Sequence, residues 1–287
     1  MLVPYRDADN AFRFLSVSPQ PRLLRASQAS ARTAADGPFA AFLAVELLIW
    51  GSLYGVYLVV RGSTIAGFGE ALGNARRVIE LERVAGLDRE QLIQDATRAV
   101  AGLEDGLARY YELGFFPVVI AGLLYLAYRD RTRYREVRTA MLVAIGAATV
   151  VFALLPTAPP RLVPGLGLED TVGMNAHDTG SLHGLPYNPY AAMPSMHVGW
   201  TLLLAIGLFA ASSGLLARVV TAAHPAVMTV AVVATGNHYL LDALVGAAIA
   251  LAALALVRHH GRPAPDEPAR RPRARAPMHP RPHWPMA

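Results

Sequence analysis

The chain has 287 residues, of which 54% are hydrophobic and 16% charged, a balance that indicates a membrane protein and not a soluble domain. There is no cysteine, which excludes disulfides, thiolate catalysis and cysteine-based metal sites. The formal net charge is +5, and all 26 basic residues are arginine. The lack of lysine and the abundance of alanine are typical of a GC-rich genome, so we expect a high-GC bacterium as the source.

Residues 1–38 are polar and are predicted to form a loose cytoplasmic arm. Six apolar segments follow, each long enough, or nearly so, to cross a bilayer, which needs about 20 residues per helix. They are residues 39–60, 113–128, 139–156, 198–213, 216–236 and 240–257. The second and fourth are short, and we expect them to extend by a turn into their flanks. No cleavable signal peptide is evident, because the first apolar run begins near Pro38.

Between the first and second spans, residues 62–110 have an amphipathic pattern. Apolar residues recur at helical spacing in two groups, Val78, Leu81 and Ala85, and then Leu92, Ala96, Ala99 and Leu103. We predict one or two amphipathic helices on the outer surface. They would pack as a cap over the helix bundle, with lateral lipid access as a secondary role.

The arginines define the orientation. Eighteen lie in the arm, in the loop after the second span, in the turn after the fourth and in the tail, whereas eight lie in the remaining loops. The positive-inside rule therefore places both termini in the cytoplasm, and the basic balance is a topology signal and not a sign of nucleic-acid binding. Residues 259–287, rich in proline and arginine, are predicted to be a disordered cytoplasmic tail. Residues 39–258 then form a membrane catalytic domain.

Two histidines stand at bends on either side of a helical hairpin. His197 ends the run Pro194-Ser195-Met196-His197, and His238 opens the run that leads to Asp242. One helix down and one helix up return the chain to the same surface, so both histidines should lie at the extracytoplasmic face. Asp242 lies four residues after His238 on one helical face, where it would fix the imidazole tautomer. This set suits phosphoryl transfer through a phosphohistidine, although a structural hydrogen bond at a helix start is the alternative for the His–Asp pair.

Other polar residues near these bends are candidates for binding a phosphate. Ser195 is predicted to cap the helix after it, so that backbone N–H groups would face a phosphate. Arg161 is the one arginine in the outer loop 157–197 and would hold phosphate oxygens, or anchor to lipid headgroups. Asn237 would orient His238, and Asn188 would contact substrate or form a turn before Pro189.

Further polar residues have weaker signals. His177 and His183 are expected at the loop surface, Glu46 is expected to pair with a neighbouring helix, and His224 precedes Pro225, which would mark a kink. There is no His-Glu-x-x-His string and the outer acids are scattered, so neither a catalytic metal nor another cofactor is expected. No glycine-rich phosphate loop occurs, which argues against nucleotide hydrolysis.

At these residues the chain resembles the type 2 phosphatidic acid phosphatase superfamily. It looks most like the inositolphosphotransferase branch, which contains fungal inositol phosphorylceramide synthases and bacterial relatives. The resemblance runs from about Asn74 to Val257, and its motifs are Asn74-Ala75-Arg76-Arg77 with Glu82-Arg83, Tyr110-Tyr111, Pro156-Thr157-Ala158-Pro159-Pro160-Arg161, the run Asn188 to His197, and the run Asn237 to Asp242.

The resemblance implies an all-α bundle of six transmembrane helices, no metal requirement, His238 as nucleophile, Asp242 as its orienting partner and His197 as the acid for the leaving oxygen. It also implies phosphate binding by Ser195 and Arg161. The chain departs from the phosphatase pattern at three places: the first motif has no lysine and has Leu162 where a proline normally follows the arginine, Met196 replaces a glycine, and Ala231 and Val232 replace a Ser-Arg pair. The loss of these two cations fits the synthase branch better than the phosphatase branches. It leaves less positive charge to hold a phosphomonoester dianion, which favours a phosphodiester donor.

We therefore predict a membrane lipid phosphotransferase or phosphohydrolase that transfers a phosphoinositol-like or other phosphoryl headgroup from a phospholipid. The first alternative is a phosphatase of lipid phosphates or polyprenyl diphosphates. An alternative of another class is a non-catalytic protein that binds or translocates lipids. The sequence does not define an oligomeric state.

Overall fold

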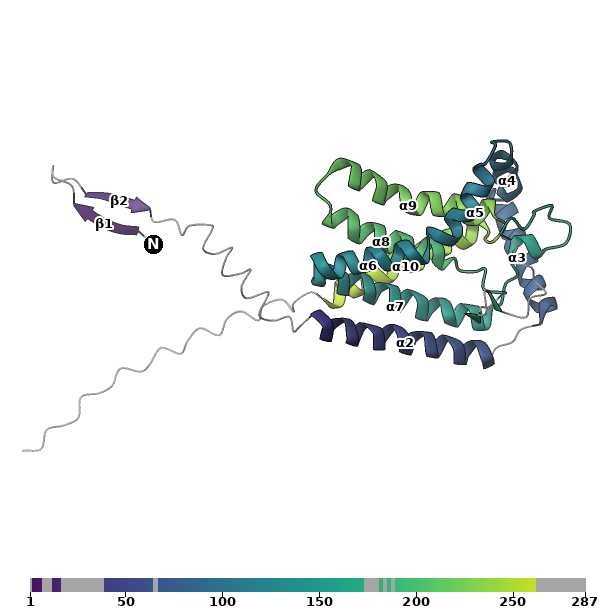
Figure 1. Cartoon of the computed structure of the whole chain (residues 1–287), viewed down its shortest axis with the longest axis horizontal. Coiled ribbons are helices and arrows are strands. Elements are labelled where there is room, and N and C mark those ends of the chain that lie inside the picture. The colour runs from purple at the N-terminus through teal and green to yellow at the C-terminus, as the bar shows by residue number, and fades with distance from the viewer. Residues whose placement is uncertain are drawn as a thin grey trace, which may run out of the picture. The chain divides into compact units, whose positions relative to one another are not determined.

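The computed structural model describes residues 2–6, 12–16, 39–63, 67–172, 181–182, 185–186 and 189–261 (Figure 1). By its internal contacts the chain divides into two units, residues 1–59 and 60–287. In the first, β1 (Leu2–Arg6) pairs antiparallel with β2 (Phe12–Ser16), so two segments of the expected loose arm are strands. Helix α2 (Phe39–Ser63) follows, and Glu46 within it is buried.

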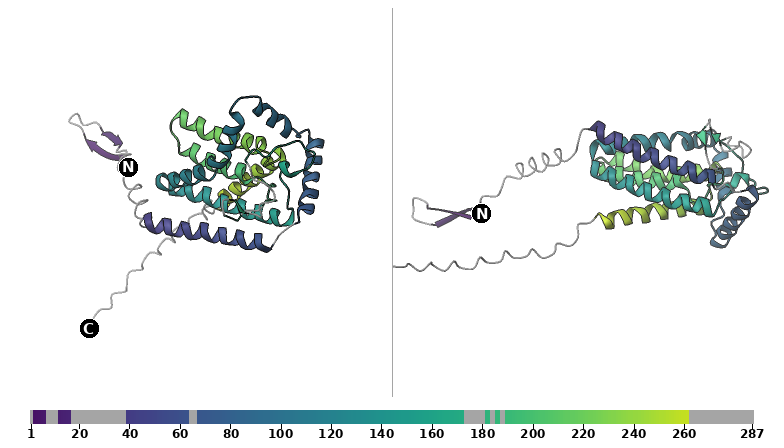
Figure 2. Two further views of the ribbon diagram at one scale, coloured as in Figure 1. Left: turned by 45° about the vertical axis from the view of Figure 1, so that its right-hand side comes forward. Right: turned by 90° about the horizontal axis from the view of Figure 1, so that it is seen from below.

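The second unit is built from helices. Short helices come first: α3 (Phe68–Ala85), α4 (Glu90–Arg98) and α5 (Leu103–Leu113). The long bundle follows, with α6 (Phe116–Arg129), α7 (Arg131–Leu154), α8 (Met196–Ala211), α9 (Leu215–Ala234) and α10 (Leu240–His260). The views of Figure 2 show the bundle helices running side by side, with α3 and α4 at one end. The second unit also contains the 3-10 turn η1 (Pro160–Leu162) and the short antiparallel pair β3 (Ser181–Leu182) and β4 (Leu185–Pro186).

The bundle is that of a polytopic membrane protein. Of the described helices, α2, α7, α9 and α10 are long and apolar enough to cross a bilayer, and α5 with α6 make a fifth candidate, bent by 49°. Helix α8 is equally apolar but has 16 residues. The predicted all-α membrane fold is confirmed, whereas the number of six spans stays a prediction.

One helix boundary and one number of helices differ from the sequence-based expectation. Helix α7 begins at Arg131 and not near residue 139, so most of the arginine-rich "loop" is helical. Asp130 explains this start, because its carboxylate accepts a hydrogen bond from the backbone N–H of Arg133 at 3.0 Å and caps the helix. The interval 62–110 forms three helices where one or two were expected.

The predicted apolar faces of the cap were partly wrong. Helix α3 buries Val78 but exposes Leu81, and helix α4 exposes Leu92 while it buries Glu90 and Gln94. The buried polar groups have partners in the chain: Gln94 Nε2 donates to the carbonyl oxygens of Glu169 and Ala234 at 3.0 and 2.8 Å. Hydrogen bonding to loop and helix ends therefore decides which face of α4 turns inward.

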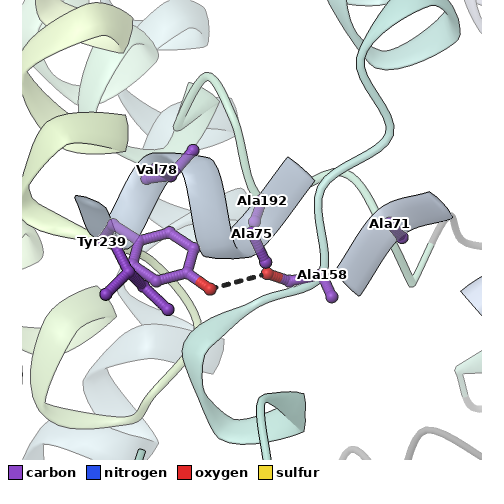
Figure 3. Packing of buried hydrophobic residues seen from close by; sticks show 7 residues of the cluster. Ala71, Ala75, Val78, Ala158, Ala192 and Tyr239 are labelled. Carbon is purple, nitrogen blue, oxygen red and sulfur yellow. Dashed lines mark hydrogen bonds between the residues drawn. The ribbon is translucent and has the colours of Figure 1, made fainter. Parts of the chain in front are cut away.

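An alanine-rich buried cluster joins α3 to the loops and to the start of α10 (Figure 3). Its members are Ala71, Ala75, Val78, Ile79, Ala158, Ala192 and Tyr239. The alanines allow backbones to approach, and the backbone N–H of Ala158 donates to the Ala71 carbonyl at 3.1 Å. The Tyr239 hydroxyl donates to the Ala158 carbonyl at 3.0 Å, so the start of α10 is tied to the turn that precedes Arg161.

Candidate functional site

Three chain segments meet beside the alanine-rich cluster: the turn 156–161, the segment 190–197 and the segment 235–242. The first two pair like neighbouring strands, since the N–H of Thr157 donates to Tyr190 at 2.7 Å and that of Ala192 donates to Thr157 at 3.3 Å. Asn74 on α3 donates to the Pro156 carbonyl at 2.8 Å. These bonds fix the loops that carry the predicted site residues.

The structure brings His197 and His238 together. His238 Nε2 lies 3.3 Å from His197 Nδ1, and the ring centroids are 5.4 Å apart. His197 is in the first turn of α8, and His238 lies two residues before α10. The reversal of the chain through α8 and α9 thus returns the second imidazole to the first.

Two acceptors lie near the other nitrogen of His238. Nδ1 is 2.7 Å from the backbone oxygen of Ala192 and 3.5 Å from Asp242 Oδ2. Asp242, fully buried, also accepts from the backbone N–H of Tyr239 at 3.0 Å. The closer partner for Nδ1–H is therefore a carbonyl group that no sequence pattern indicates, and Asp242 contributes a longer contact.

Ser195 is the N-cap residue of α8, as the sequence predicts, but its side chain makes no capping bond. Its hydroxyl oxygen is buried and without a hydrogen-bond partner among the described residues, while its backbone N–H donates to the Asp242 carbonyl at 3.0 Å. A capping role for the Ser195 side chain was thus wrong.

Helices α8 and α10 approach closely at two glycines. A Cβ atom on Gly199 would lie 2.9 Å from the Gly246 carbonyl oxygen, and one on Gly246 would collide with the Ser195 carbonyl. Glycine at both positions therefore allows the contact that holds the two histidines at adjoining helix starts.

Arg161 is tied to the segment that leads to His238, because its backbone N–H donates to the Gly236 carbonyl at 3.0 Å, and its side chain is 3% exposed. Its Nη1 donates to Asn237 Oδ1, and its Nε is 3.7 Å from Asp170 Oδ2. Asn237 in turn donates from Nδ2 to the Thr235 hydroxyl at 2.8 Å. Asn237 was expected to orient His238, but its side-chain bonds orient Arg161 instead.

Aromatic rings cover the other side of His197. The ring of Tyr111 on α5 stacks on it with centroids 4.7 Å apart, and the ring of Phe115 lies at 4.2 Å. Tyr110-Tyr111 stood out as a motif without an assigned role, and the structure shows that one of the pair contacts the site.

Two carboxyl groups at the site had no role assigned from the sequence: Glu82 stood in a motif, and Glu90 had no signal. Glu90 accepts from the backbone N–H of Leu240 at 2.9 Å, and Glu82 accepts from that of Leu241 at 2.7 Å. Burial and the nearby carboxylate of Glu90 raise the pKa of Glu82 to about 8, although the Leu241 bond opposes the rise. Burial also raises the pKa of Tyr239, which keeps its hydroxyl a neutral donor.

Several predicted residues lie elsewhere. Asn188, His177 and His183 fall outside the described residues. His224 hydrogen-bonds through Nδ1 to the Tyr110 hydroxyl, and helix α9 runs on through Pro225. Within the described ranges, no three His, Asp or Glu side chains are grouped so that they could hold a metal ion.

The fold and the site define a multi-pass membrane protein with a histidine pair at the start of two adjoining helices. A family model described as the PAP2 superfamily matches residues 76–256, which is well over half of the chain. The chain therefore belongs to the PAP2 superfamily and is a PAP2-like membrane enzyme.

No curated protein matches the sequence significantly. Among solved structures, the crystal structure of Aquifex aeolicus LpxE is similar, with 16% sequence identity and a TM-score of 0.44 over 61% of this chain and 94% of that chain.

Proposed function

We propose that this protein is a lipid phosphotransferase that works through a phosphohistidine on His238, with a phosphodiester lipid as donor. The observation that carries the proposal is the geometry of His238. Its Nδ1 is bonded to the Ala192 carbonyl, and its Nε2 faces His197 at 3.3 Å. A proton held on Nδ1 leaves the lone pair of Nε2 free to attack phosphorus.

In the first step a bond forms between His238 Nε2 and phosphorus, and the bond from phosphorus to the leaving oxygen breaks. His197 gives its proton to that oxygen. In the second step His197 accepts the proton of an incoming hydroxyl, whose oxygen bonds to phosphorus as the P–N bond breaks. The two nitrogens are too close to hold phosphorus and the leaving oxygen between them, so we expect the rings to part when substrate enters.

The developing charge would be stabilised at the start of α8. The Ser195 hydroxyl, the backbone N–H groups of the first turn and Arg161 are the proposed donors to the phosphate oxygens. Arg161 must share its charge with Asp170, and the carboxyl groups of Asp242 and Glu90 also lie at the start of α10. This balance suits a phosphodiester with one negative charge better than a phosphomonoester dianion.

We further propose that residues 39–258 form the catalytic domain, that both termini are cytoplasmic and that the histidines face outward. A phospholipid or polyprenyl phosphate would then enter from the membrane. The donor we favour carries a phosphoinositol-like headgroup, and the acceptor is a lipid hydroxyl.

The test is to incubate purified protein with labelled phosphatidylinositol, phosphatidate and polyprenyl diphosphate and to trap the headgroup on the protein. We expect phosphatidylinositol to label His238, and His238→Ala to lose activity by about a thousandfold or more. His259→Ala, at the exposed far end of α10, is the matched control and should stay active.

Two outcomes separate the alternatives. If the label is released only to water, with or without acceptor lipids, the enzyme is a hydrolase and the transferase proposal is wrong. If His238→Ala keeps full activity, the phosphohistidine mechanism itself is wrong.

A further inference from the structure

The first turn of α10 is held by three carboxylates from three elements. Consecutive backbone N–H groups donate to them: Tyr239 to Asp242 at 3.0 Å, Leu240 to Glu90 at 2.9 Å and Leu241 to Glu82 at 2.7 Å. The first N–H groups of a helix have no partner within the helix, so these contacts satisfy groups that would otherwise be unpaired. Negative charge at this end is also favoured by the helix dipole.

Glu82 and Glu90 come from the cap and not from the bundle. Their side chains are 1% and 7% exposed, and they reach across 159 and 150 positions of sequence to α10. A buried side-chain oxygen that accepts a hydrogen bond from a backbone N–H holds that N–H in place more firmly than a water molecule does. The cap therefore does more than cover the bundle, because it sets where α10 begins.

This turn controls both imidazoles. His238 precedes Leu240 by two residues, and the carbonyl of Asp242 accepts the Ser195 N–H, which stands at the start of the helix that carries His197. A shift of the turn would thus move the two rings relative to each other. The carboxylates also occupy the amides of α10, which leaves the start of α8 as the place for a phosphate.

We propose that Glu82 and Glu90 are positioning residues, which lock the first turn of α10 so that His238 and His197 are aligned for in-line transfer. Neither carboxylate touches substrate. The kinetic part of the proposal rests on the proposed function, whereas the structural part can be tested without any substrate.

The kinetic test compares Glu82→Ala and Glu82→Gln in the full chain, with labelled phosphatidylinositol as the probe. Misplacement of a nucleophile acts on the chemical step, so Glu82→Ala should lower kcat by about tenfold or more and leave KM within about twofold. Glu82→Gln keeps an oxygen that accepts from Leu241 and should restore most of kcat. Glu80→Ala removes an exposed carboxylate from the same helix and should match the wild type.

The second test is hydrogen–deuterium exchange of the wild-type protein and the same variants, followed on peptides spanning residues 236–243. First-turn amides normally exchange fast, so slow exchange at Leu240 and Leu241 is the expected sign of the carboxylate bonds. Glu90→Ala should speed exchange at Leu240, and Asp95→Asn on the exposed face of α4 should not.

Fast exchange at both amides in the wild type would overturn the proposal, even if the alanine variants fail to fold. Equal kcat in Glu82→Ala and the wild type would overturn it as well. A wild-type protein that is inactive on every donor, yet slow to exchange at these amides, would refute the proposed function and leave the positioning role supported.

Discussion

The Glu82 carboxyl group combines deep burial with a second carboxylate close by. Burial penalises the charged form, and the charges of Glu90 and Asp242 add to that penalty, so the pKa rises from 4.5 to about 8. Glu82 therefore holds its proton near neutral pH. A neutral Glu82 carboxyl group can lie beside Glu90 and still accept the backbone N–H bond of Leu241 without mutual repulsion of two charges.

This pKa predicts how stability depends on pH. The unfolded chain releases the Glu82 proton near its ordinary pKa of 4.5, whereas the folded chain holds it to about 8. The folded state thus binds more protons between these values, and stability should fall as pH rises, by up to about 1.4 kcal/mol per pH unit.

The measurement is the apparent Tm of detergent-solubilised protein at several pH values within that window. Glu82→Gln should flatten the pH dependence, and Glu80→Gln, exposed on the same helix, should keep it. A wild-type Tm that rises from acid to neutral pH, with no change in Glu82→Gln, would contradict the assignment.

Residue types and spacing made the histidines, Asp242, Ser195 and Arg161 candidates, and the structure brings His197, His238 and Asp242 together as expected, while their roles stay a prediction. They could not predict Glu90 or the Ala192 carbonyl. A glutamate that binds a distant backbone amide has the same sequence signal as an exposed one, and a carbonyl group is present at every residue. Both contacts depend on how loops far apart in sequence meet.

At the scale of elements, the crossing of α8 and α10 depends on Gly199 and Gly246. A Cβ atom on Gly199 would press on the Gly246 carbonyl oxygen, and one on Gly246 would collide with the backbone of Ser195 at the start of α8. Lipid gives little drive for helices to associate, so close packing at small residues carries much of the contact. The same crossing brings the two histidine-bearing helix starts together.

We predict that Gly246→Ala forces α8 and α10 apart and costs about 1–3 kcal/mol of stability, with a matching loss of activity. Gly146→Ala on α7 is the control, because nothing lies within 4 Å of an added Cβ atom there. Alanine favours a helix over glycine, so this control should be neutral or slightly stabilising. Thermal unfolding of both variants in detergent decides the matter, and an unchanged Tm for Gly246→Ala would refute the crossing.

Elements were predictable where hydrophobicity alone defines them. The six apolar runs correspond to α2, α6, α7, α8, α9 and α10 with shifts of a few residues at most ends. The exceptions have physical reasons. Helix α7 begins before its apolar run because arginines are readily accepted in the polar first turns of a helix. The inward face of α4 is polar because its hydrogen-bond partners are backbone groups.

For the whole molecule, the distribution of arginines predicts that the site end of the bundle lies outside the cytoplasm. The absence of cysteine makes this testable, because any introduced thiol is the sole one in the chain. Asp88→Cys lies in the exposed turn between α3 and α4, and Ser213→Cys lies in the exposed turn between α8 and α9.

A membrane-impermeant maleimide should label the Asp88→Cys variant in intact cells and the Ser213→Cys variant only after permeabilisation. The reverse pattern would place the site in the cytoplasm and would contradict the predicted topology. Labelling of both variants in intact cells would show that at least one of these turns is misplaced.

Topology of this kind is readable from sequence because membrane insertion itself responds to local charge. The identity of the lipid is not, since it depends on the shape of a site assembled from five or more separated segments. Arg161 illustrates the limit: its position predicted a phosphate ligand, but its sharing between Asn237 and Asp170 emerged only from the fold.

The main-chain oxygen of Ala192, 2.7 Å from His238 Nδ1, has a consequence for how this enzyme could evolve or be redesigned. Side-chain replacement at position 192 leaves that oxygen in place, so drift in sequence there does not remove the group that selects the tautomer. Weakening it takes a backbone edit, such as an ester linkage in place of the peptide bond between Ala192 and Met193, whose carbonyl is a poorer acceptor. A side-chain mutation at position 192 therefore leaves the hydrogen-bond acceptor of His238 Nδ1 in the backbone.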